Sequence, residues 1–355
     1  MKDDGYLMIS RIEIKSFRCF NTLALTGLRR VNLLVGDSGS GKTALLETLF
    51  LTSCGNPEAY FRLRKWRGFG DANTPITLTR EAFESLFLYL FHNGDKEKIA
   101  RVSFVDSREG RRGLDIYFEG QGTLNVDLSK RETAVNITPI TFKWEVNNHI
   151  TPITLEIADG TIKGKGNAEL FPLHYISNKN MGSHWDAVQF STLSREGRLC
   201  EILRAIKDTF GIIEDLSLEL STGEALVHAK IPGFAEKIPI NELSGGLNKY
   251  LSIALAIANN KNGVVCVDEI DTGFYHKHHP QIMRSLVGLC DLYSVQLFLS
   301  THSWEFLRAA AESMKDQPEK LSLLRTRYAN NECTIRKSDG DLAISAIADD
   351  IEVRD

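Results

Sequence analysis

Apolar and polar positions alternate near the start of the chain. Residues 11–15 place two isoleucines on one face and three charged side chains on the other, which predicts a half-buried strand. Residues 31–35 form a short apolar run that ends at a glycine, as is typical of a strand buried on both faces. The apolar stripe at residues 45–50 has helical spacing and predicts a helix shortly after that glycine.

Further along, the spacing predicts alternating blocks of strands and helices. Short alternating runs separated by Gly and Asn predict antiparallel strands between residues 101 and 158. Other strands are expected at 173–176, 264–267 and 296–299, with a strand-rich stretch at 212–240. Helices are expected at 80–93, 194–210, 247–258 and 280–290. The 53 residues after His302 indicate a strand, a hairpin and a short helix.

This order of elements predicts an α/β fold whose core is interrupted by inserted lobes. Residues 1–55 would form the first part of the core, and residues 56–185 an inserted helix plus an antiparallel β region. Residues 186–240 would form a helical and β lobe. Residues 241–355 would return to the core with a long helix and the C-terminal strands.

Composition narrows the class of protein. Lys and Arg number 42 against 46 Asp and Glu, a net charge of −4, so any nucleic-acid contact must come from a local patch. Hydrophobic residues at 43 % and charged residues at 25 % exclude wholesale disorder. No apolar run approaches the roughly 18 residues of a membrane helix. The first ten residues lack the features of a signal peptide, so we expect a cytoplasmic protein with no membrane partner.

The six cysteines are scattered along the chain and none forms a CxxC pair. This spacing argues against a zinc ribbon or a disulfide framework and fits a reducing compartment. We expect buried thiols at Cys19, Cys54, Cys200, Cys266, Cys290 and Cys333.

The strongest motif is the run Gly36-Asp37-Ser38-Gly39-Ser40-Gly41-Lys42-Thr43, which lies between a predicted strand and a predicted helix. Its glycines let backbone N–H groups turn toward phosphate oxygens, and the helix N-terminus adds partial positive charge. Lys42 would reach the β- and γ-phosphates of ATP, and the Thr43 hydroxyl would bind Mg²⁺. The alternative, a Gly-Ser turn with a solvated lysine, does not account for the flanking elements.

Two carboxylates follow the buried strand at 264–267. Asp268 at the strand tip would hold Mg²⁺, and Glu269 would polarise the attacking water as a general base. An acidic turn at a strand end is the structural alternative. The phosphate-binding motif upstream favours the catalytic interpretation over this alternative.

Two shorter motifs are weaker by themselves. Ser244, Gly245 and Gly246 begin the helix at 247–258, where Ser-Gly-Gly indicates either an anion-binding N-terminus or an ordinary helix cap. His302 follows the strand at 296–299, at the carboxyl end where open α/β sheets bind ligands. A hydrogen-bonded structural histidine is the alternative there.

Taken together and in this order, the four motifs resemble the ATP-binding-cassette ATPase head, within the RecF, SMC and OLD-type branch. The opening ISRIEIKSFRCF, the segment LSGGLNKYLSIALAIA and the segment LFLSTHSWEFL are similar to the corresponding parts of those heads. The resemblance covers residues 8–52 and 240–310 well, and the middle of the chain only in the order of its elements. It implies a P-loop NTPase with an ABC-type core, an antiparallel β lobe and a helical signature lobe.

The resemblance also implies how such a head works. Two heads sandwich two ATP molecules, so Ser244, Gly245 and Gly246 would act on nucleotide held by the partner's phosphate-binding loop. His302 would sense the γ-phosphate as a catalytic residue beside Glu269 and Lys42. Asp271 would lie in the loop that faces the dimer and contact ATP there. A homodimer, open to higher assembly, and a protein effector supplied in trans are therefore expected.

One position departs from the family pattern. The family has a glutamine that contacts magnesium and water just after a strand like 173–176, where this chain has Ser177 and Asn178. Either Asn178 substitutes for it or a loop lets Gln189 reach the site, and the sequence leaves both open. Arg18, in the turn after the first strand, is either a contact to the α-phosphate or adenine side or an exposed arginine.

Basic residues alternate with aromatic ones between residues 60 and 70. Such a mixture suits phosphate contact and base stacking by DNA, although an exposed, partly packed loop is an equal alternative. A smaller basic cluster is expected at Arg108, Arg111 and Arg112. The larger patch consists of Arg62, Arg64, Lys65, Trp66 and Arg67.

What the chain lacks limits its function. No heptads separate the phosphate-binding loop from the signature segment, which excludes a chromosome-scale SMC protein, and the C-terminal residues are too few for the nuclease domain of OLD-type proteins. The resemblance implies a stand-alone ATPase that dimerises on ATP and switches a partner, in anti-phage defence or genome maintenance. A RecF-like DNA repair clamp and a nucleotide-gated scaffold with little turnover are the alternatives.

Overall fold

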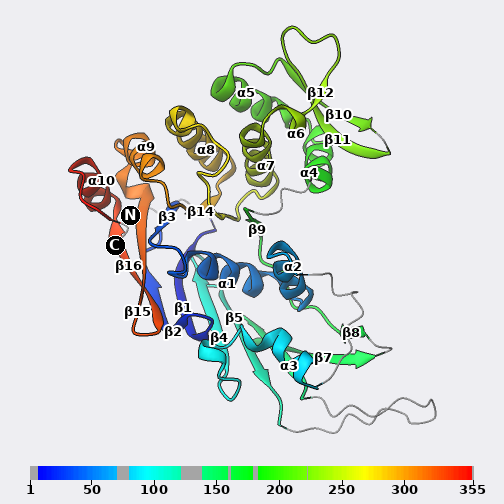
Figure 1. Ribbon diagram of the computed structural model, residues 1–355, viewed down its shortest axis with the longest axis vertical. Helices are drawn as coiled ribbons and strands as arrows, with labels where there is room; N and C mark the ends of the chain where they lie inside the picture. The colour runs from blue at the N-terminus through cyan, green and yellow to red at the C-terminus, as the bar shows by residue number, and fades with distance from the viewer. Residues whose placement is uncertain are drawn as a thin grey trace.

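The computed structural model describes six stretches of the chain: residues 7–69, 80–120, 138–158, 161–178, 183–221 and 223–353. A six-stranded sheet lies at its centre, in the order β16-β15-β3-β14-β13-β9 (Figure 1). Five of its strands are parallel, and only β16 runs antiparallel to its neighbour. The six are β3 (Val31–Val35), β9 (Leu173–Ile176), β13 (Val264–Val267), β14 (Gln296–Ser300), β15 (Leu321–Ala329) and β16 (Glu332–Asp339).

A second, seven-stranded sheet is antiparallel throughout, in the order β2-β1-β4-β5-β6-β7-β8. It confirms the predicted first strand and the antiparallel region. Its strands are β1 (Ile9–Phe17), β2 (Phe20–Thr26), β4 (Ala100–Asp106), β5 (Arg111–Phe118), β6 (Ile140–Val146), β7 (His149–Ala158) and β8 (Thr161–Gly164).

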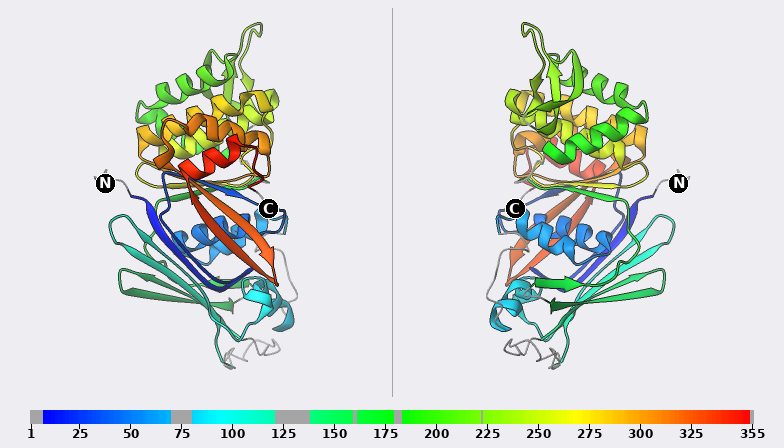
Figure 2. Two further views of the ribbon diagram at one scale, coloured as in Figure 1. Left: turned by 90° about the vertical axis from the view of Figure 1, so that its left-hand side faces the viewer. Right: turned by 90° about the vertical axis from the view of Figure 1, so that its right-hand side faces the viewer.

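Helix α1 (Lys42–Cys54) contacts both sheets and lies between them (Figure 2). Eleven of its thirteen residues are buried, which explains why its apolar pattern lacks a strong polar face. The central strands divide the core because their successive side chains point to opposite faces. Leu33 packs toward the helices on one side, whereas Leu34 packs toward α1 and the seven-stranded sheet. The start of α1 is therefore held rigidly on both sides.

A helical lobe covers the other face of the central sheet (Figure 1). It includes a three-stranded sheet of β10 (Asp215–Ser221), β11 (Glu224–Lys230) and β12 (Ile238–Pro239). Its buried centre is α7, whose residues from Gly246 to Ala258 are all shielded from solvent. The helices are α4 (Ser183–Arg195), α5 (Leu199–Phe210), α6 (Ile240–Leu243), α7 (Gly245–Asn259) and α8 (His279–Tyr293).

Three expectations about helices need correction. The helix expected at 80–93 is α3 (Arg80–Leu88), and the chain then turns through Asn93 and Gly94, both with positive φ. The helix expected at 194–210 is split at Gly197, whose φ of 67° separates α4 from α5. The tail after His302 begins with α9 (Trp304–Met314), where a strand was expected, because Ser303 caps a new helix. The remaining helices are α2 (Glu58–Trp66) and α10 (Gly340–Ala348), with short 3₁₀ turns at His92–Gly94, His276–His278 and Pro318–Lys320.

The expectation about cysteines is correct in part. All six thiols are free, and Cys266, Cys290 and Cys333 are buried. Cys19 and Cys54 are half-buried, and Cys200 is exposed at the start of α5, contrary to the prediction. Within the described ranges, no helix is long and apolar enough to cross a bilayer.

We expect Asp186 to make the protein less stable above pH 6. Its carboxylate is buried in α4 and accepts a 2.6 Å hydrogen bond from Ser252 of α7. Burial raises the pKa of Asp186 from 3.8 to about 6. Since the folded state holds its proton more tightly than the unfolded state, stability is fully present below pH 4 and is lost as the pH rises to 6. At 1.36 kcal/mol per pKa unit the loss is about 3 kcal/mol.

Asp186→Asn keeps an acceptor for Ser252 and removes the ionisation. The free energy of unfolding, measured with urea, should therefore exceed that of the wild type by up to about 3 kcal/mol at pH 7.5 and by roughly half of that at pH 5. Asp208→Asn, on the exposed side of α5, serves as the matched control. A gain that is the same at both pH values would rule out ionisation as its cause.

Candidate functional site

The carboxyl ends of the parallel strands meet at one edge of the central sheet. Gly36 follows β3, Ser177 follows β9, Asp268 follows β13 and Thr301 follows β14. Because parallel strands share the same edge, side chains from four distant parts of the sequence converge there. A cavity of about 1050 Å³ opens at this edge, and Gly39, Lys42 and Thr43 are among its lining residues.

The loop from Gly36 to Gly41 has the backbone that its glycines allow. Gly36 has a φ of 138°, and a Cβ placed there would lie 2.1 Å from the Thr326 carbonyl oxygen. Gly41 has a φ of 101° and packs against the thiols of Cys19 and Cys333. Ser40 is buried and its hydroxyl donates to the Asp37 carbonyl at 2.7 Å. The loop therefore presents backbone rather than the Ser40 side chain to the cavity.

Lys42, the first residue of α1, is bent back over this loop. Its ammonium group donates to the carbonyl oxygens of Gly36 at 2.6 Å and Asp37 at 2.7 Å. Burial lowers the pKa of Lys42 to about 8, against the opposing effect of Asp268 and Asp37. The charge is thus already desolvated beside the cavity, where it interacts strongly with an anionic ligand.

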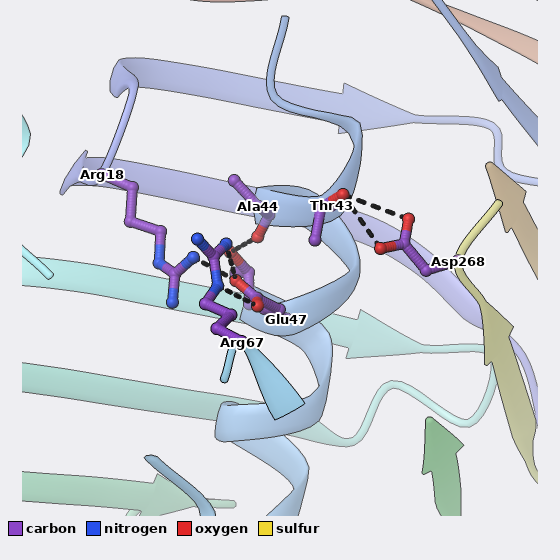
Figure 3. Close-up of polar contacts among 7 residues, drawn as sticks. Arg18, Thr43, Ala44, Glu47, Arg67 and Asp268 are labelled. Carbon is purple, nitrogen blue, oxygen red and sulfur yellow. Dashed lines mark hydrogen bonds and ion pairs between the residues drawn. The ribbon is translucent and has the colours of Figure 1, made fainter. Parts of the chain in front are cut away.

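Thr43 and Asp268 face each other across the cavity floor (Figure 3). The Thr43 hydroxyl lies 3.1 and 3.0 Å from the two carboxylate oxygens of Asp268, and Ser300 donates to the same carboxylate at 2.6 Å. A hydroxyl and a carboxylate suit Mg²⁺, which takes one or two protein ligands and completes its shell with water and phosphate. The described residues contain no cluster of three or more His, Cys, Asp and Glu side chains that could hold a metal ion.

Glu269 extends from the loop after β13 in a constrained backbone conformation. Its φ is 48°, a left-handed value that is uncommon for glutamate. The Ser300 hydroxyl accepts its N–H at 2.7 Å, and its carboxylate accepts a hydrogen bond from the Asn178 amide. Both Glu269 and Asn178 line the cavity. The loop therefore holds a carboxylate at the point where Mg²⁺ and phosphate would meet.

The structure distinguishes Asn178 from Gln189, the two candidates for the role that a glutamine has in the family pattern. Asn178 follows β9 and contacts Glu269. Gln189 is buried within α4, its side-chain nitrogen has no hydrogen-bond partner, and it does not line the cavity. The structure therefore brings Asn178, and not Gln189, to the predicted site.

The other two residues named after strand ends lie in different places. His302 follows β14 and is among the residues that line the cavity, as is Glu269. Asp271 lies outside the cavity and accepts a hydrogen bond from the Thr301 hydroxyl. A role for Asp271 toward the nucleotide of its own chain is thus not supported by its position.

The signature residues begin α7 in the helical lobe. The Ser244 hydroxyl caps this helix by accepting the Leu247 N–H at 3.4 Å, as the structural alternative predicts. Ser244 and Gly245 are nevertheless exposed, and Gly246 is buried against Gly273. None of the three is among the described residues that line the cavity. The N-terminal end of α7 therefore opens to the surface and not into the cavity of its own chain.

A buried carboxylate on α1 organises one wall of the cavity (Figure 3). Glu47 is 2 % exposed and pairs with Arg18, from the turn after β1, and with Arg67, from the end of α2. Arg67 reaches both oxygens of Glu47 at 2.8 Å. Arg18 and Arg67 both line the cavity, so Arg18 is neither an isolated nor a fully solvated arginine.

The predicted basic patch lies on a helix and not in a loop. Arg64 donates to the Leu86 carbonyl at 3.1 Å, and Trp66 stacks on Tyr175 with ring centroids 5.5 Å apart. Arg64, Trp66 and Arg67 line the cavity, while Arg62 and Lys65 are exposed. A nucleic-acid role for the patch stays a prediction.

The smaller basic cluster does not form as expected. Arg112 is 5 % exposed, because its guanidinium donates to the carbonyls of Glu169 and Leu170. Arg108 and Arg111 remain exposed. The sequence could not show this, since all three arginines flank a turn between strands.

Sequence reasoning missed two residues that organise the site. Ser300 connects Asp268 to the backbone of Glu269, and Glu47 holds the two arginines. In the segment Ser300-Thr301-His302-Ser303, only the histidine was predicted to have a role. The sequence did offer a signal for Glu47, which is the only carboxylate on the largely buried helix α1.

Comparison with known proteins places these features in context. Residues 11–222 match the family described as "AAA domain", and residues 166–308 match the family described as "AAA domain, putative AbiEii toxin, Type IV TA system". The chain is 20 % identical to an ATP/GTP phosphatase from Helicobacter pylori, over 91 % of this chain and 96 % of that protein.

Further similarities involve chromosome and repair proteins, among them a match of 49 residues at 39 % identity to the DNA replication and repair protein RecF of Idiomarina loihiensis, which covers 14 % of each chain. The chain is 25 % identical to structural maintenance of chromosomes protein 6 from Takifugu rubripes, over 46 % of this chain but only 15 % of that protein. A solved SMC head, bound to the C-terminal winged-helix domain of ScpA, matches 94 % of this chain and 99 % of its own with a TM-score of 0.50 at 11 % identity. That similarity shows the fold, an SMC-head and ABC-ATPase type of α/β structure.

Proposed function

The chain is an ATPase of the AAA domain family, and we propose that two copies close around two ATP molecules to switch a partner protein. One observation carries the proposal: the cavity holds the phosphate-binding loop, Asp268, Glu269 and His302, but not the exposed helix end at Ser244. A second copy can supply that end to the open side of the cavity. The fold is thus suited to a sandwich in which each site has residues from both chains.

Within one chain, binding begins at the loop from Gly36 to Gly41. Its backbone amides and the start of α1 stabilise phosphate oxygens, and the Lys42 ammonium exchanges its carbonyl partners for phosphate. Thr43 and Asp268 would hold Mg²⁺. When bound, that ion neutralises charge that develops on the phosphates.

Hydrolysis then depends on the residues at the strand ends. Glu269 accepts a proton from the attacking water, and Asn178 fixes the orientation of its carboxylate. His302, which also lines the cavity, donates a hydrogen bond toward the γ-phosphate. Arg18 and Arg67, held by Glu47, make the opposite wall positive and favour the anionic nucleotide.

The partner copy completes the site. Ser244, Gly245 and the first turn of its α7 approach the γ-phosphate with free N–H groups and the positive end of the helix dipole. Asp271 then faces the other copy from the loop that adjoins α7. Each bound nucleotide then contacts both chains, so ATP binding and dimer formation are coupled.

The biological setting belongs to the same proposal. One matching family is described as a putative AbiEii toxin of a type IV TA system, and a 49-residue similarity links the chain to the repair protein RecF of Idiomarina loihiensis. These similarities support a role in defence or genome maintenance. The solved SMC head is bound to ScpA, which supports an effector that docks on the head in trans.

Light scattering of a Glu269→Gln variant tests the sandwich. Blocked hydrolysis should trap the closed state, so Mg-ATP is expected to raise the mass from 39.8 kDa to about twice that value. Without nucleotide the mass should stay at that of the monomer.

A second substitution in the same background controls for nonspecific association. Ser244→Arg places a bulky cation at the exposed end of α7 and leaves the phosphate-binding loop intact. This double variant should bind ATP and remain a monomer. An unchanged monomer mass for Glu269→Gln, with ATP binding confirmed, would reject the proposed dimer.

A further inference from the structure

Lys249 is a buried lysine whose role the sequence did not indicate. It lies one turn into α7, is 2 % exposed, and makes three hydrogen bonds through its ammonium group. The acceptors are the Glu269 carbonyl at 2.6 Å, the Thr272 hydroxyl at 2.6 Å and the Thr272 carbonyl at 3.1 Å. Burying a charged ammonium group destabilises a protein unless hydrogen bonds compensate the lost hydration. The three hydrogen bonds supply this compensation.

The acceptors of Lys249 belong to the loop that carries Glu269. The Thr272 hydroxyl donates to the Asn178 side-chain oxygen at 2.7 Å, and the Asn178 amide donates to the Glu269 carboxylate. Lys249 is therefore linked to Glu269 in two ways. It bonds directly to the Glu269 backbone carbonyl, and it reaches the Glu269 carboxylate indirectly through Thr272 and Asn178. The chain of contacts runs from α7 to the position expected for the attacking water.

The start of α7 touches the same loop at a second point. A Cβ built on Gly246 would lie 2.5 Å from the Gly273 carbonyl oxygen, so the helix and the loop pack backbone to backbone. Gly246 and Lys249 are one helical turn apart and lie on the same side of α7. Any displacement of this helix end must therefore move the loop of residues 269–273.

We propose that Lys249 is a positioning residue that links the end of α7 to Glu269 of the same chain. This inference rests on the proposed dimer, in which that helix end binds the partner's nucleotide. Engagement of the partner's γ-phosphate then sets the backbone of Glu269 and readies the chain's own site. Each site thereby senses whether the other is filled.

The local charges agree with this assignment. Burial lowers the pKa of Lys249 to about 8, whereas the carboxylates of Asp271, Glu269 and Asp268 raise it. Methionine has similar length and no donor, so Lys249→Met removes the three hydrogen bonds without adding bulk. Thr272→Val breaks the same connection from the loop and introduces no cavity near α7.

Steady-state kinetics and nucleotide binding separate positioning from binding. We expect Lys249→Met and Thr272→Val to lower kcat by about tenfold or more, the effect of misplacing a general base. The Kd for a fluorescent ATP analogue should change less than about twofold, since neither residue lines the cavity. Lys261→Met, just beyond the exposed end of α7, is the matched control and should keep the wild-type kcat.

Mixed dimers show which chain Lys249 serves. One chain carries Glu269→Gln, so the single hydrolysing site uses Glu269 of the other chain. Placing Lys249→Met in the hydrolysing chain should slow turnover at least threefold more than placing it in the Glu269→Gln chain. The reverse order, as a distorted helix end would give, overturns the inference.

Two outcomes keep the inference distinct from the proposed function. If Glu269→Gln fails to dimerise with Mg-ATP, the sandwich itself is wrong. If it dimerises and both Lys249→Met and Thr272→Val keep kcat within about twofold of wild type, with unchanged circular dichroism, the positioning role alone is wrong.

Discussion

Glu269→Gln is expected to slow steady-state ATP hydrolysis by about 10²- to 10⁴-fold, the usual contribution of a general base. The substitution keeps an oxygen that can accept the hydrogen bond from Asn178, so the geometry of the loop should persist. It removes the carboxylate that would take the proton from water. Phosphate release measured at saturating Mg-ATP gives kcat, and a fluorescent analogue gives the nucleotide Kd, which should change little because Lys42 and Thr43 are unaltered.

The control for this substitution is Glu224→Gln, an exposed carboxylate in the three-stranded sheet. Wild-type turnover in Glu269→Gln would show that another residue acts as the base. Adding double-stranded DNA to the wild-type ATPase assay distinguishes the three proposed functions, namely a switch for a protein partner, a DNA clamp and a nucleotide-gated scaffold. Stimulation favours a DNA clamp, indifference favours a protein partner, and bound nucleotide with negligible wild-type turnover favours a gated scaffold.

Much of the fold could be predicted from local pattern. The strands Val31–Val35 and Val264–Val267 are short continuous apolar runs, and α7 has an apolar stripe of helical period. The structure confirms all three elements. The helix boundaries that were predicted wrongly lie at single residues with positive φ. Asn93 and Gly197 end or split helices by backbone conformation, which apolar periodicity does not report.

The phosphate-binding side of the site was predictable for a related reason. Residues 36–43 are contiguous, and their chemistry depends on backbone geometry that the glycines encode. Asp268, Glu269 and His302 follow apolar strands, and the parallel sheet brings such strand ends together. One sequence therefore suffices to place these residues near one another.

The connections among these residues could not be read from sequence. Asn178 was one of two candidates that the family pattern offered, and only its contact with Glu269 separates it from Gln189. Ser300 and Lys249 also reach Glu269, and no sequence pattern distinguishes them from other polar residues. The basic patch shows the opposite problem. Its composition indicated a nucleic-acid surface, yet Arg67 pairs with a carboxylate in α1 that is 20 residues away in sequence.

Two inactive variants should restore activity to each other when they are mixed. Lys42→Met removes the cation from the phosphate-binding loop, and Ser244→Arg blocks the end of α7 that serves the other chain. Each variant alone should lose nearly all ATP hydrolysis, because every site in its homodimer contains the defect. A mixed dimer joins an intact loop from the Ser244→Arg chain to an intact helix end from the Lys42→Met chain.

One complete site therefore forms in each mixed dimer. In a random equimolar mixture half of the dimers are mixed and each has one complete site of two, so recovered activity should reach at most about a quarter of wild type. If the link through Lys249 needs the second nucleotide, recovery is about tenfold lower but still above that of either variant alone. Coupled assays of phosphate release over a range of mixing ratios measure it, with a maximum expected at equal amounts. The matched control mixes Lys42→Met with the Lys42→Met/Ser244→Arg double variant, which has no intact loop and should give no recovery. If the equimolar mixture is as inactive as its components, Ser244 does not complete the site of a second copy, because a residue that acts within its own chain cannot be complemented in this way.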